Sequence, residues 1–362
     1  MSPAKRVPER ANSDTGTMAD DGWPDWIDPA AANRLRDAIR GGRIGHAYLL
    51  SGPKGVGKAA AARAFAQSLC CTNEKRADRS APCGECRACR NVLRGAHPDV
   101  ETFSLETQVM LADKPGRGAT LTIETVRRLR ASGALFPLEC DRRILIIDDA
   151  ETLLEPAQQA LLKTLEEPPQ GVTLMLLADE PEALLETVRS RCQEVVLRPV
   201  SQVAVALALQ RRGIDDSLAM EAAELSRGCA GWALAAVADK KVLQARREER
   251  ASAARWIASP QYEKLVTAFT LGDQFTKRRA EVIGVVQAAI QILRDEMIAV
   301  AQAPSEAENE PHTSGMAPPA FVFSRAISAT LQCLSDLNSN VRPRLALEAM
   351  VMAWPNWEPR TR

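Results

Sequence analysis

The chain has 362 residues, 46% of them hydrophobic and 25% charged, which is enough material for about two or three domains. Its 46 Lys and Arg residues balance 46 Asp and Glu residues, so no global positive field holds it on nucleic acid, and any DNA contact should be local or shared with partners. No apolar run approaches the roughly 20 residues that span a bilayer, which excludes a membrane anchor. Residues 1–22 lack an apolar signal core, so we predict a cytoplasmic protein with a disordered tail there, in which Met18 is a candidate start.

Short apolar runs of strand length alternate with longer helical patterns through residues 23–199. This alternation is typical of an α/β domain, with a parallel sheet covered by helices on both faces. One helix is predicted from Leu154, Ala157, Leu161 and Leu165, which form one apolar face ending at Pro168-Pro169. The predicted strands are His46 to Leu50, Arg143 to Asp148, Thr173 to Ala178, and Glu194 to Leu197.

A phosphate-binding motif follows the first predicted strand. It has the GxxxxGK spacing of a P-loop and leads into an Ala-rich helix. Its glycines, Gly52, Gly55 and Gly57, would let backbone N–H groups close around the phosphates of ATP or ADP. Lys58 would reach the terminal phosphates. The next residue, Ala59, stands where a Ser or Thr hydroxyl normally coordinates Mg²⁺, which argues against hydrolysis.

Four cysteines indicate a metal-binding module at residues 71–89. Their C-x11-C-x2-C-x2-C pattern suits tetrahedral Zn²⁺, and thiols without a secretion signal stay reduced, which argues against a disulfide framework. We predict a structural zinc that holds the polar loop between these cysteines in place. An iron–sulfur cluster and free buried thiols are the alternatives, and Cys70 is a rival for the first ligand position. The predicted ligands are Cys71, Cys83, Cys86 and Cys89.

Two acidic residues end the second predicted strand. Asp148 occupies the place of a metal-binding carboxylate, and Asp149 stands where a Glu would position water in ATPases, one methylene shorter. In the alternative interpretation the whole P-loop no longer binds nucleotide, and Lys58 pairs with a carboxylate such as Asp148.

After Pro199 the sequence becomes Ala- and Leu-rich with helical periodicity, interrupted by a surface loop near residues 303–320.

Five further segments carry a resemblance to a known family. They are Gly45–Pro53, Ala96–Asp99 after the cysteines, Ala160–Pro169, Val188–Cys192 and Asn340–Glu348. Together they resemble the bacterial clamp loaders of DNA polymerase III, AAA+ proteins that include the delta-prime subunit and the motor subunits tau and gamma. The resemblance implies a nucleotide-binding-like domain at 23–199, a helical lid at 200–243 and a helical collar at 244–362 that packs into a hetero-oligomeric ring.

The resemblance also implies roles for single residues. A nucleotide-sensing Arg of the motor subunits matches Gly231 here, which again weakens a motor function. Arg191 would serve as an arginine finger toward ATP on a neighbouring subunit; Arg189 is the weaker alternative, and Arg191 could instead simply pair with an acidic group. The expected function is that of a non-motor partner of tau/gamma and delta within the polymerase holoenzyme, which loads the sliding clamp on primed DNA. An active tau/gamma-like ATPase is the alternative.

Overall fold

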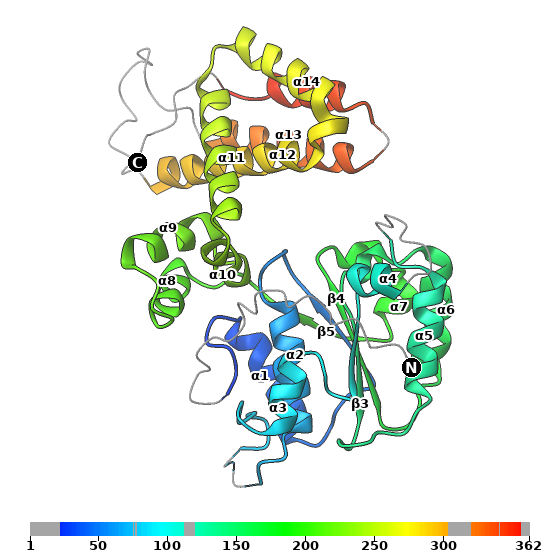
Figure 1. Ribbon diagram of the computed structural model, residues 1–362. Helices are drawn as coiled ribbons and strands as arrows, with labels where there is room; N and C mark the ends of the chain where they lie inside the picture. The colour runs from blue at the N-terminus through cyan, green and yellow to red at the C-terminus, as the bar shows by residue number, and fades with distance from the viewer. Residues whose placement is uncertain are drawn as a thin grey trace. The chain divides into compact units, whose positions relative to one another are not determined.

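The structure is a computed structural model that describes residues 22–74, 76, 78–111, 120–302, 320–339 and 341–355. The chain divides into two compact units, Met1–Asp239 and Lys240–Arg362 (Figure 1). The predicted tail, the candidate start at Met18 and nearly all of the predicted loop near 303–320 lie outside the described residues.

The first unit is built on a five-stranded parallel sheet with strand order β2-β3-β4-β1-β5. The four strands predicted from apolar runs are confirmed to within one residue at each end. The strand at one edge, β2, was not predicted, because its four residues, VETF, place two polar residues between two apolar ones and form no apolar run. The strands are β1 (Ala47–Ser51), β2 (Val100–Phe103), β3 (Arg143–Ile147), β4 (Val172–Ala178) and β5 (Gln193–Val196).

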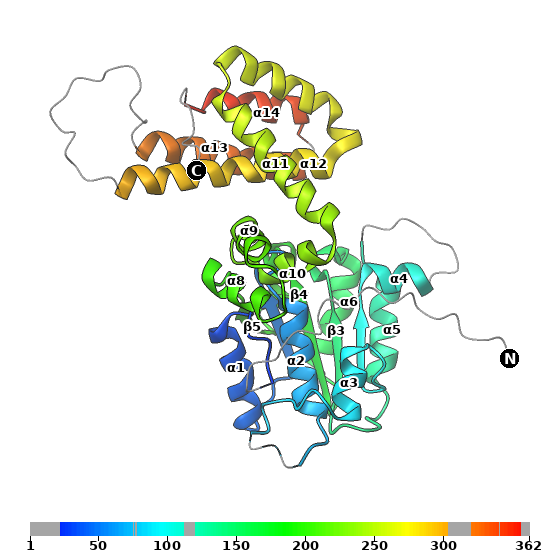
Figure 2. The same cartoon turned by 60° about the vertical axis from the view of Figure 1, so that its left-hand side comes forward.

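Helices cover both faces of this sheet, as the alternating pattern predicts (Figure 2). In β1, Tyr48 and Leu50 enter the core beneath one helical layer, whereas Ala47 and Leu49 enter the core beneath the other, because successive strand residues point to opposite faces. One layer holds α1 (Pro29–Arg40), α2 (Lys58–Cys70) and α3 (Arg87–Leu93), and the other holds α5 (Ile123–Gly133) and α6 (Glu155–Glu166). The shorter α4 (Leu105–Leu111), α7 (Glu186–Arg189), η1 (Ala150–Thr152) and η2 (Pro181–Ala183) join these elements.

The predicted helix ahead of Pro168 is α6, and it packs on the sheet through Ala157, Leu161 and Leu165. Leu154 is not part of that face: it is the N-cap residue and is 46% exposed. Gln158 is buried and links α6 to the segment before α7, because its amide donates to the Ala183 carbonyl and accepts from the Leu185 N–H. The short helix that ends just before Arg191 is thereby fixed to α6.

Three helices complete the first unit: α8 (Gln202–Gln210), α9 (Asp216–Ser226) and α10 (Ala230–Ala238). Their apolar residues join the core that α1 and α2 share with the sheet. Asp25, which precedes α1, forms ion pairs with Arg211 and Arg212 at the end of α8, at 2.7 and 3.4 Å. The predicted lid residues therefore have their own contacts to the N-terminal part of this unit.

The described residues of the second unit form helices joined by short turns, as the Ala- and Leu-rich pattern predicts. Trp256 and Trp354 stack edge to face in its core, with ring centroids 4.8 Å apart. Lys264 is fully buried and donates to the Pro355 carbonyl at 2.8 Å, which gives its ammonium group a hydrogen-bond partner. The helices are α11 (Lys240–Ala258), α12 (Gln261–Gln302, with non-helical geometry at Arg278), α13 (Ala320–Asn338) and α14 (Pro343–Met352).

Among the described residues, no helix is both long enough and apolar enough to cross a bilayer.

Candidate functional site

The P-loop connects β1 to α2, as the sequence predicts. Gly52, Gly55 and Gly57 have φ angles of 143°, 79° and 111°, which side-chain-bearing residues rarely adopt. A Cβ atom at Gly52 would lie 2.3 Å from the Leu197 carbonyl oxygen, so this turn also needs glycine for space. The loop therefore keeps the backbone path that a phosphate-binding turn requires.

Lys58 is buried at the start of α2 and is fully engaged within the chain. Its Nζ lies 2.5 Å from Asp179 Oδ1 and donates to the Gly52 carbonyl at 2.7 Å. A carboxylate partner was foreseen in the alternative interpretation, with Asp148 as the example, but the residue in contact is Asp179. Sequence reasoning missed Asp179, although it directly follows β4 and so lies at the same carboxyl edge of the parallel sheet as Asp148.

Asp148 and Asp149 lie at the end of β3. Burial raises the pKa of Asp148, and the neighbouring Asp149 raises it further, while Arg63 and Lys58 act in the opposite direction. Asp149 has a φ of 55°, unusual for a residue other than glycine. The structure thus brings the P-loop lysine and both predicted carboxylates to one region, while Ala59, at the second position of α2, adds only a methyl group.

The N-terminus of α10 packs directly on the P-loop. The Trp232 N–H donates to the Gly55 carbonyl at 3.1 Å. A Cβ atom at Gly231 would lie 2.8 Å from that same carbonyl oxygen, closer than real Cβ contacts come. The position expected to carry a nucleotide-sensing arginine in motor subunits therefore admits no side chain in this arrangement.

The four predicted ligand cysteines come together, with their sulfur atoms all within 4.8 Å of one another. The Cys83–Cys89 and Cys86–Cys71 sulfur distances are 4.0 and 3.9 Å. A tetrahedral Zn²⁺ with Zn–S bonds of about 2.3 Å requires sulfur atoms about 3.8 Å apart. The cluster therefore has the dimensions of a tetrahedral metal site and could hold a metal ion.

Hydrogen bonds at the cluster favour thiolate sulfur. The backbone N–H of Cys86 donates to the Cys83 sulfur at 3.3 Å, and that of Cys89 donates to the Cys86 sulfur at 3.4 Å. Burial raises the pKa of Cys71 and that of Cys89. Burial acts the same way on Cys86, but the N–H groups of Cys89 and Thr72 outweigh it and lower the pKa to about 6. Four adjacent thiolates need a cation, because like charges this close disfavour ionisation.

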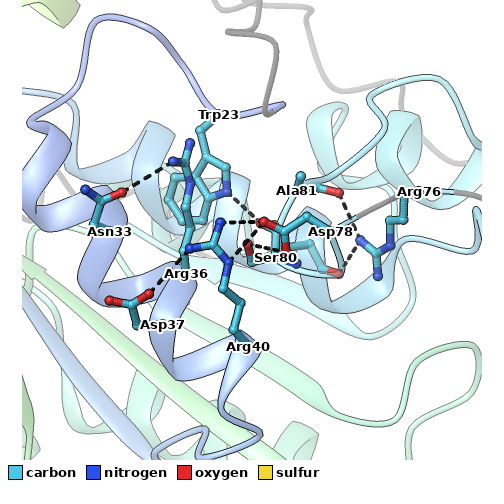
Figure 3. Close-up of polar contacts among 10 residues, drawn as sticks. Trp23, Asn33, Arg36, Asp37, Arg40, Arg76, Asp78, Ser80 and Ala81 are labelled. Atoms are coloured by element: carbon cyan, nitrogen blue, oxygen red, sulfur yellow. Dashed lines mark hydrogen bonds and ion pairs between the residues drawn. The ribbon is translucent and has the colours of Figure 1, made fainter.

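Polar contacts fasten the loop between the first two cysteines to the N-terminal part of the domain (Figure 3). Trp23 donates from its indole nitrogen to the Ser80 carbonyl at 2.8 Å, and Arg36 lies over the Trp23 ring at 5.3 Å. Arg40 pairs with Asp78 at 2.5 Å, and Asp78 in turn accepts from the Ser80 N–H. The loop is therefore held in place by protein contacts as well as by its cysteines.

Cys70, the rival for the first ligand, is bonded to Cys140 in a disulfide. Cys71, not Cys70, lies in the four-cysteine cluster. The bridge departs from the expectation of reduced thiols throughout, and nothing in the sequence indicated it, because its two cysteines are 70 residues apart.

Arg191 lies just beyond α7, with its side chain 37% exposed. It pairs with Glu166, itself 50% exposed, at 2.8 Å and donates to the Thr187 carbonyl at 2.9 Å. An acidic partner within the chain is thus present, in line with the alternative that Arg191 simply pairs with an acidic group. Arg189 is also partly buried, and its Nε is buried without a hydrogen-bond partner.

The first unit has a parallel sheet between two helical layers, a P-loop after β1, acidic residues after β3 and helix α10 packed on the loop. These features define a P-loop protein of the AAA+ class. Residues 27–201 match the family model described as DNA polymerase III, delta subunit. Over these residues the chain is thus similar to the clamp-loader subunits of DNA polymerase III.

Curated clamp-loader subunits are similar to about half of this chain. The chain is 36% identical over 187 residues to DNA polymerase III subunit delta' of Pseudomonas aeruginosa, covering 51% of this chain and 53% of that protein. It is 34% identical over 164 residues to the gamma/tau subunit of Mycobacterium bovis, covering 45% and 26%. The matches thus span about half or less of these curated relatives. A crystal structure of a gamma subunit-related protein from Thermotoga maritima aligns with a TM-score of 0.37 and 16% identity, covering 91% of this chain and 100% of that one.

Proposed function

We propose that this chain is a non-motor subunit of a DNA polymerase III clamp loader, of the delta-prime kind. It would complete a hetero-oligomeric ring with tau/gamma and delta subunits and assist the ATP-dependent loading of the sliding clamp onto primed DNA. Catalysis would take place on the neighbouring motor subunits and not at its own P-loop.

The observation that carries this proposal is Ala59. Its methyl group offers no oxygen to the Mg²⁺ that neutralises phosphate charge during phosphoryl transfer. Gly231 removes a second contact, because no side chain fits against the Gly55 carbonyl. Lys58 is already paired with Asp179, so ATP or ADP would have to displace a partly buried ion pair to reach it.

Arg191 is the residue through which the chain would act chemically. Its guanidinium is part-exposed at the end of a helix that Gln158 holds rigidly to α6. Placed against ATP on an adjacent subunit, it would stabilise the charge that spreads over the transferring phosphoryl group. Its bond to Glu166 is between two solvated side chains and is weak enough to exchange.

The four-cysteine cluster would hold a structural zinc. Cys71, Cys83, Cys86 and Cys89 fill all four positions of a tetrahedral site, which leaves none for water or substrate. When bound, the metal would neutralise the thiolates and join α2 to α3. The contacts of Asp78 and Ser80 to the N-terminal segment explain how the intervening loop is ordered around such a site.

An active tau/gamma-like ATPase is the second candidate, because Lys58 and Asp148 lie where such an enzyme would have them. A steady-state assay of the purified chain distinguishes the two. Our proposal predicts turnover below about 0.1 per second, with no change in Lys58→Ala. Faster turnover that Lys58→Ala abolishes would establish the motor function instead. In a loader reconstituted with motor and delta subunits, omission of this chain should abolish clamp loading on primed DNA.

A further inference from the structure

We propose that Cys70 and Cys140, assisted by His97, form a reversible dithiol–disulfide site, which low-molecular-weight disulfides oxidise while the four-cysteine cluster is spared. The site is separate from the P-loop and from Arg191, and it does not depend on the proposed function.

The two cysteines are placed to bond by elements that hold their positions in either state. Cys70 is the last residue of α2, and Cys140 lies in the turn before β3, with Cα atoms 5.1 Å apart. This separation lies within the range that a disulfide bridges without backbone movement. Cys70 is 3% exposed, whereas Cys140 is half-buried, so the sulfur of Cys140 is the one that a small reagent reaches first.

Asp99 anchors the turn that carries Cys140. Its fully buried carboxylate accepts hydrogen bonds from the backbone N–H groups of Leu138, Glu139 and Cys140 at 2.8, 2.6 and 2.9 Å. These bonds do not involve either sulfur. The turn should therefore stay in place when the bridge is reduced, which keeps the two thiols ready to bond again.

His97 faces the sulfur of Cys140 with a proton. Its Nδ1 accepts from the Asp99 backbone N–H at 3.1 Å, so the neutral ring carries its hydrogen on Nε2. That Nε2 lies 3.6 Å from the Cys140 sulfur and 3.6 Å from a Glu139 carboxylate oxygen. An N–H directed at sulfur stabilises the thiolate, which is the reactive form in thiol–disulfide exchange.

The same geometry argues against a second metal site. The sulfur atoms of Cys70 and Cys140 and a ring nitrogen of His97 are close enough to suggest one. A ligating histidine normally donates its other N–H to an acceptor, but Nδ1 here faces an N–H donor. A metal on Nε2 would leave the ring without that proton, so we assign the cluster to thiol chemistry.

The reaction balances with a disulfide such as oxidised glutathione. The Cys140 thiolate attacks one glutathione sulfur and releases the first glutathione thiolate, which takes up a proton. The Cys70 thiol then loses its proton and attacks the Cys140 sulfur, which releases the second glutathione. Two protein thiols give up two electrons and two protons, and one oxidised glutathione becomes two reduced molecules. Cys71, next in sequence to Cys70, keeps its sulfur for the four-cysteine cluster.

The test uses the full chain, first reduced and then equilibrated in glutathione buffers of graded ratio. Free thiols are trapped by alkylation, and peptides are mapped by mass spectrometry. We expect one reversible bridge joining Cys70 and Cys140, with two of the nine thiols lost and the other seven still alkylated after a denaturing step. The control variant Cys333→Ala, altered at a buried cysteine of the second unit, should form the same bridge.

His97→Asn gives a second measurement on the same chain. Without the Nε2–H that faces Cys140, the bridge should form about tenfold more slowly than in the wild type, at unchanged position. Equal rates would remove His97 from the site. If Cys70 and Cys140 remain fully alkylated in the most oxidising buffer, or if oxidation joins cysteines of the four-cysteine cluster instead, the proposal is wrong.

Discussion

The ion pair between Arg191 and Glu166 sets how readily this arginine can leave the chain's own surface. The side chains are 37% and 50% exposed, and exposed pairs of this kind contribute about 0.2–1 kcal/mol. An arginine finger accelerates phosphoryl transfer about 10³-fold or more, which corresponds to about 4 kcal/mol. The transition state on a neighbouring subunit should therefore win the competition for the guanidinium.

Two variants separate the two interactions. Arg191→Ala should slow hydrolysis about 10³-fold at the one ATP site that it adjoins. Glu166→Gln frees the arginine and should leave that rate unchanged or raise it by at most about fivefold, the equivalent of about 1 kcal/mol. Neither change should lower the free energy of unfolding of the isolated chain by more than about 1 kcal/mol, because the pair is solvated.

Single-turnover hydrolysis by the reconstituted loader on primed DNA measures this effect. In Arg191→Ala, one kinetic phase should slow while the phases from the other sites persist. Arg198→Ala, at an exposed arginine just beyond β5, serves as the matched control and should behave as wild type. If every phase is unchanged in Arg191→Ala, the residue has no catalytic role. If Glu166→Gln and Arg191→Ala lose activity equally, the pair is structural and the finger assignment is wrong.

Three further predictions concern the framework. Metal analysis should find one zinc per chain, and Cys83→Ser should lose it and lower the melting temperature, whereas Cys333→Ala should retain it. Asp99→Ala should cost about 4 kcal/mol in urea unfolding by removing three hydrogen bonds to a buried carboxylate, and Asp99→Asn should cost less. Burial raises the pKa of Asp99, but its three N–H donors outweigh burial and lower the pKa below its usual value. The Asp99 carboxylate should therefore contribute its full stabilisation of the fold above about pH 4, the pKa of an unfolded Asp, and lose it as the pH falls through the folded pKa. Gly231→Ala should destabilise the first unit by about 1–2 kcal/mol, because the added Cβ meets the Gly55 carbonyl; no loss of stability would show that α10 shifts freely.

The sequence predicts the parts of this fold that depend on local pattern. The strands β1, β3 and β4 were found because central strands of a parallel sheet are buried on both faces and read as apolar runs. The edge strand β5 was found because it leads into the short apolar run Val195-Val196-Leu197. The edge strand β2 was missed because VETF has no such run. The P-loop and the four-cysteine cluster were found because their spacing along the chain already reflects the geometry of phosphate and metal binding.

Features that join distant segments were beyond prediction. Asp179 reaches Lys58 across 121 positions, and Cys70 meets Cys140 across 70. No local sequence pattern indicates either contact, because both depend on the order of the strands in the sheet and on where each turn returns to the sheet. Glu166 as the partner of Arg191 belongs to the same class, although an acidic partner of some kind was foreseen.

The pairing of Lys58 with Asp179 also bears on how a P-loop domain that does not hydrolyse ATP would keep its fold. A buried lysine without a counter-charge would destabilise the domain. If the phosphates of a nucleotide were the only counter-charge for Lys58, the domain would be stable only with nucleotide bound. Here the chain supplies the counter-charge itself, together with the Gly52 carbonyl. The sheet, α6 and the short helix before Arg191 can therefore keep their positions whether or not nucleotide binds. A subunit whose contribution is a correctly placed arginine needs this constancy, whereas a motor subunit needs its structure to change with ATP.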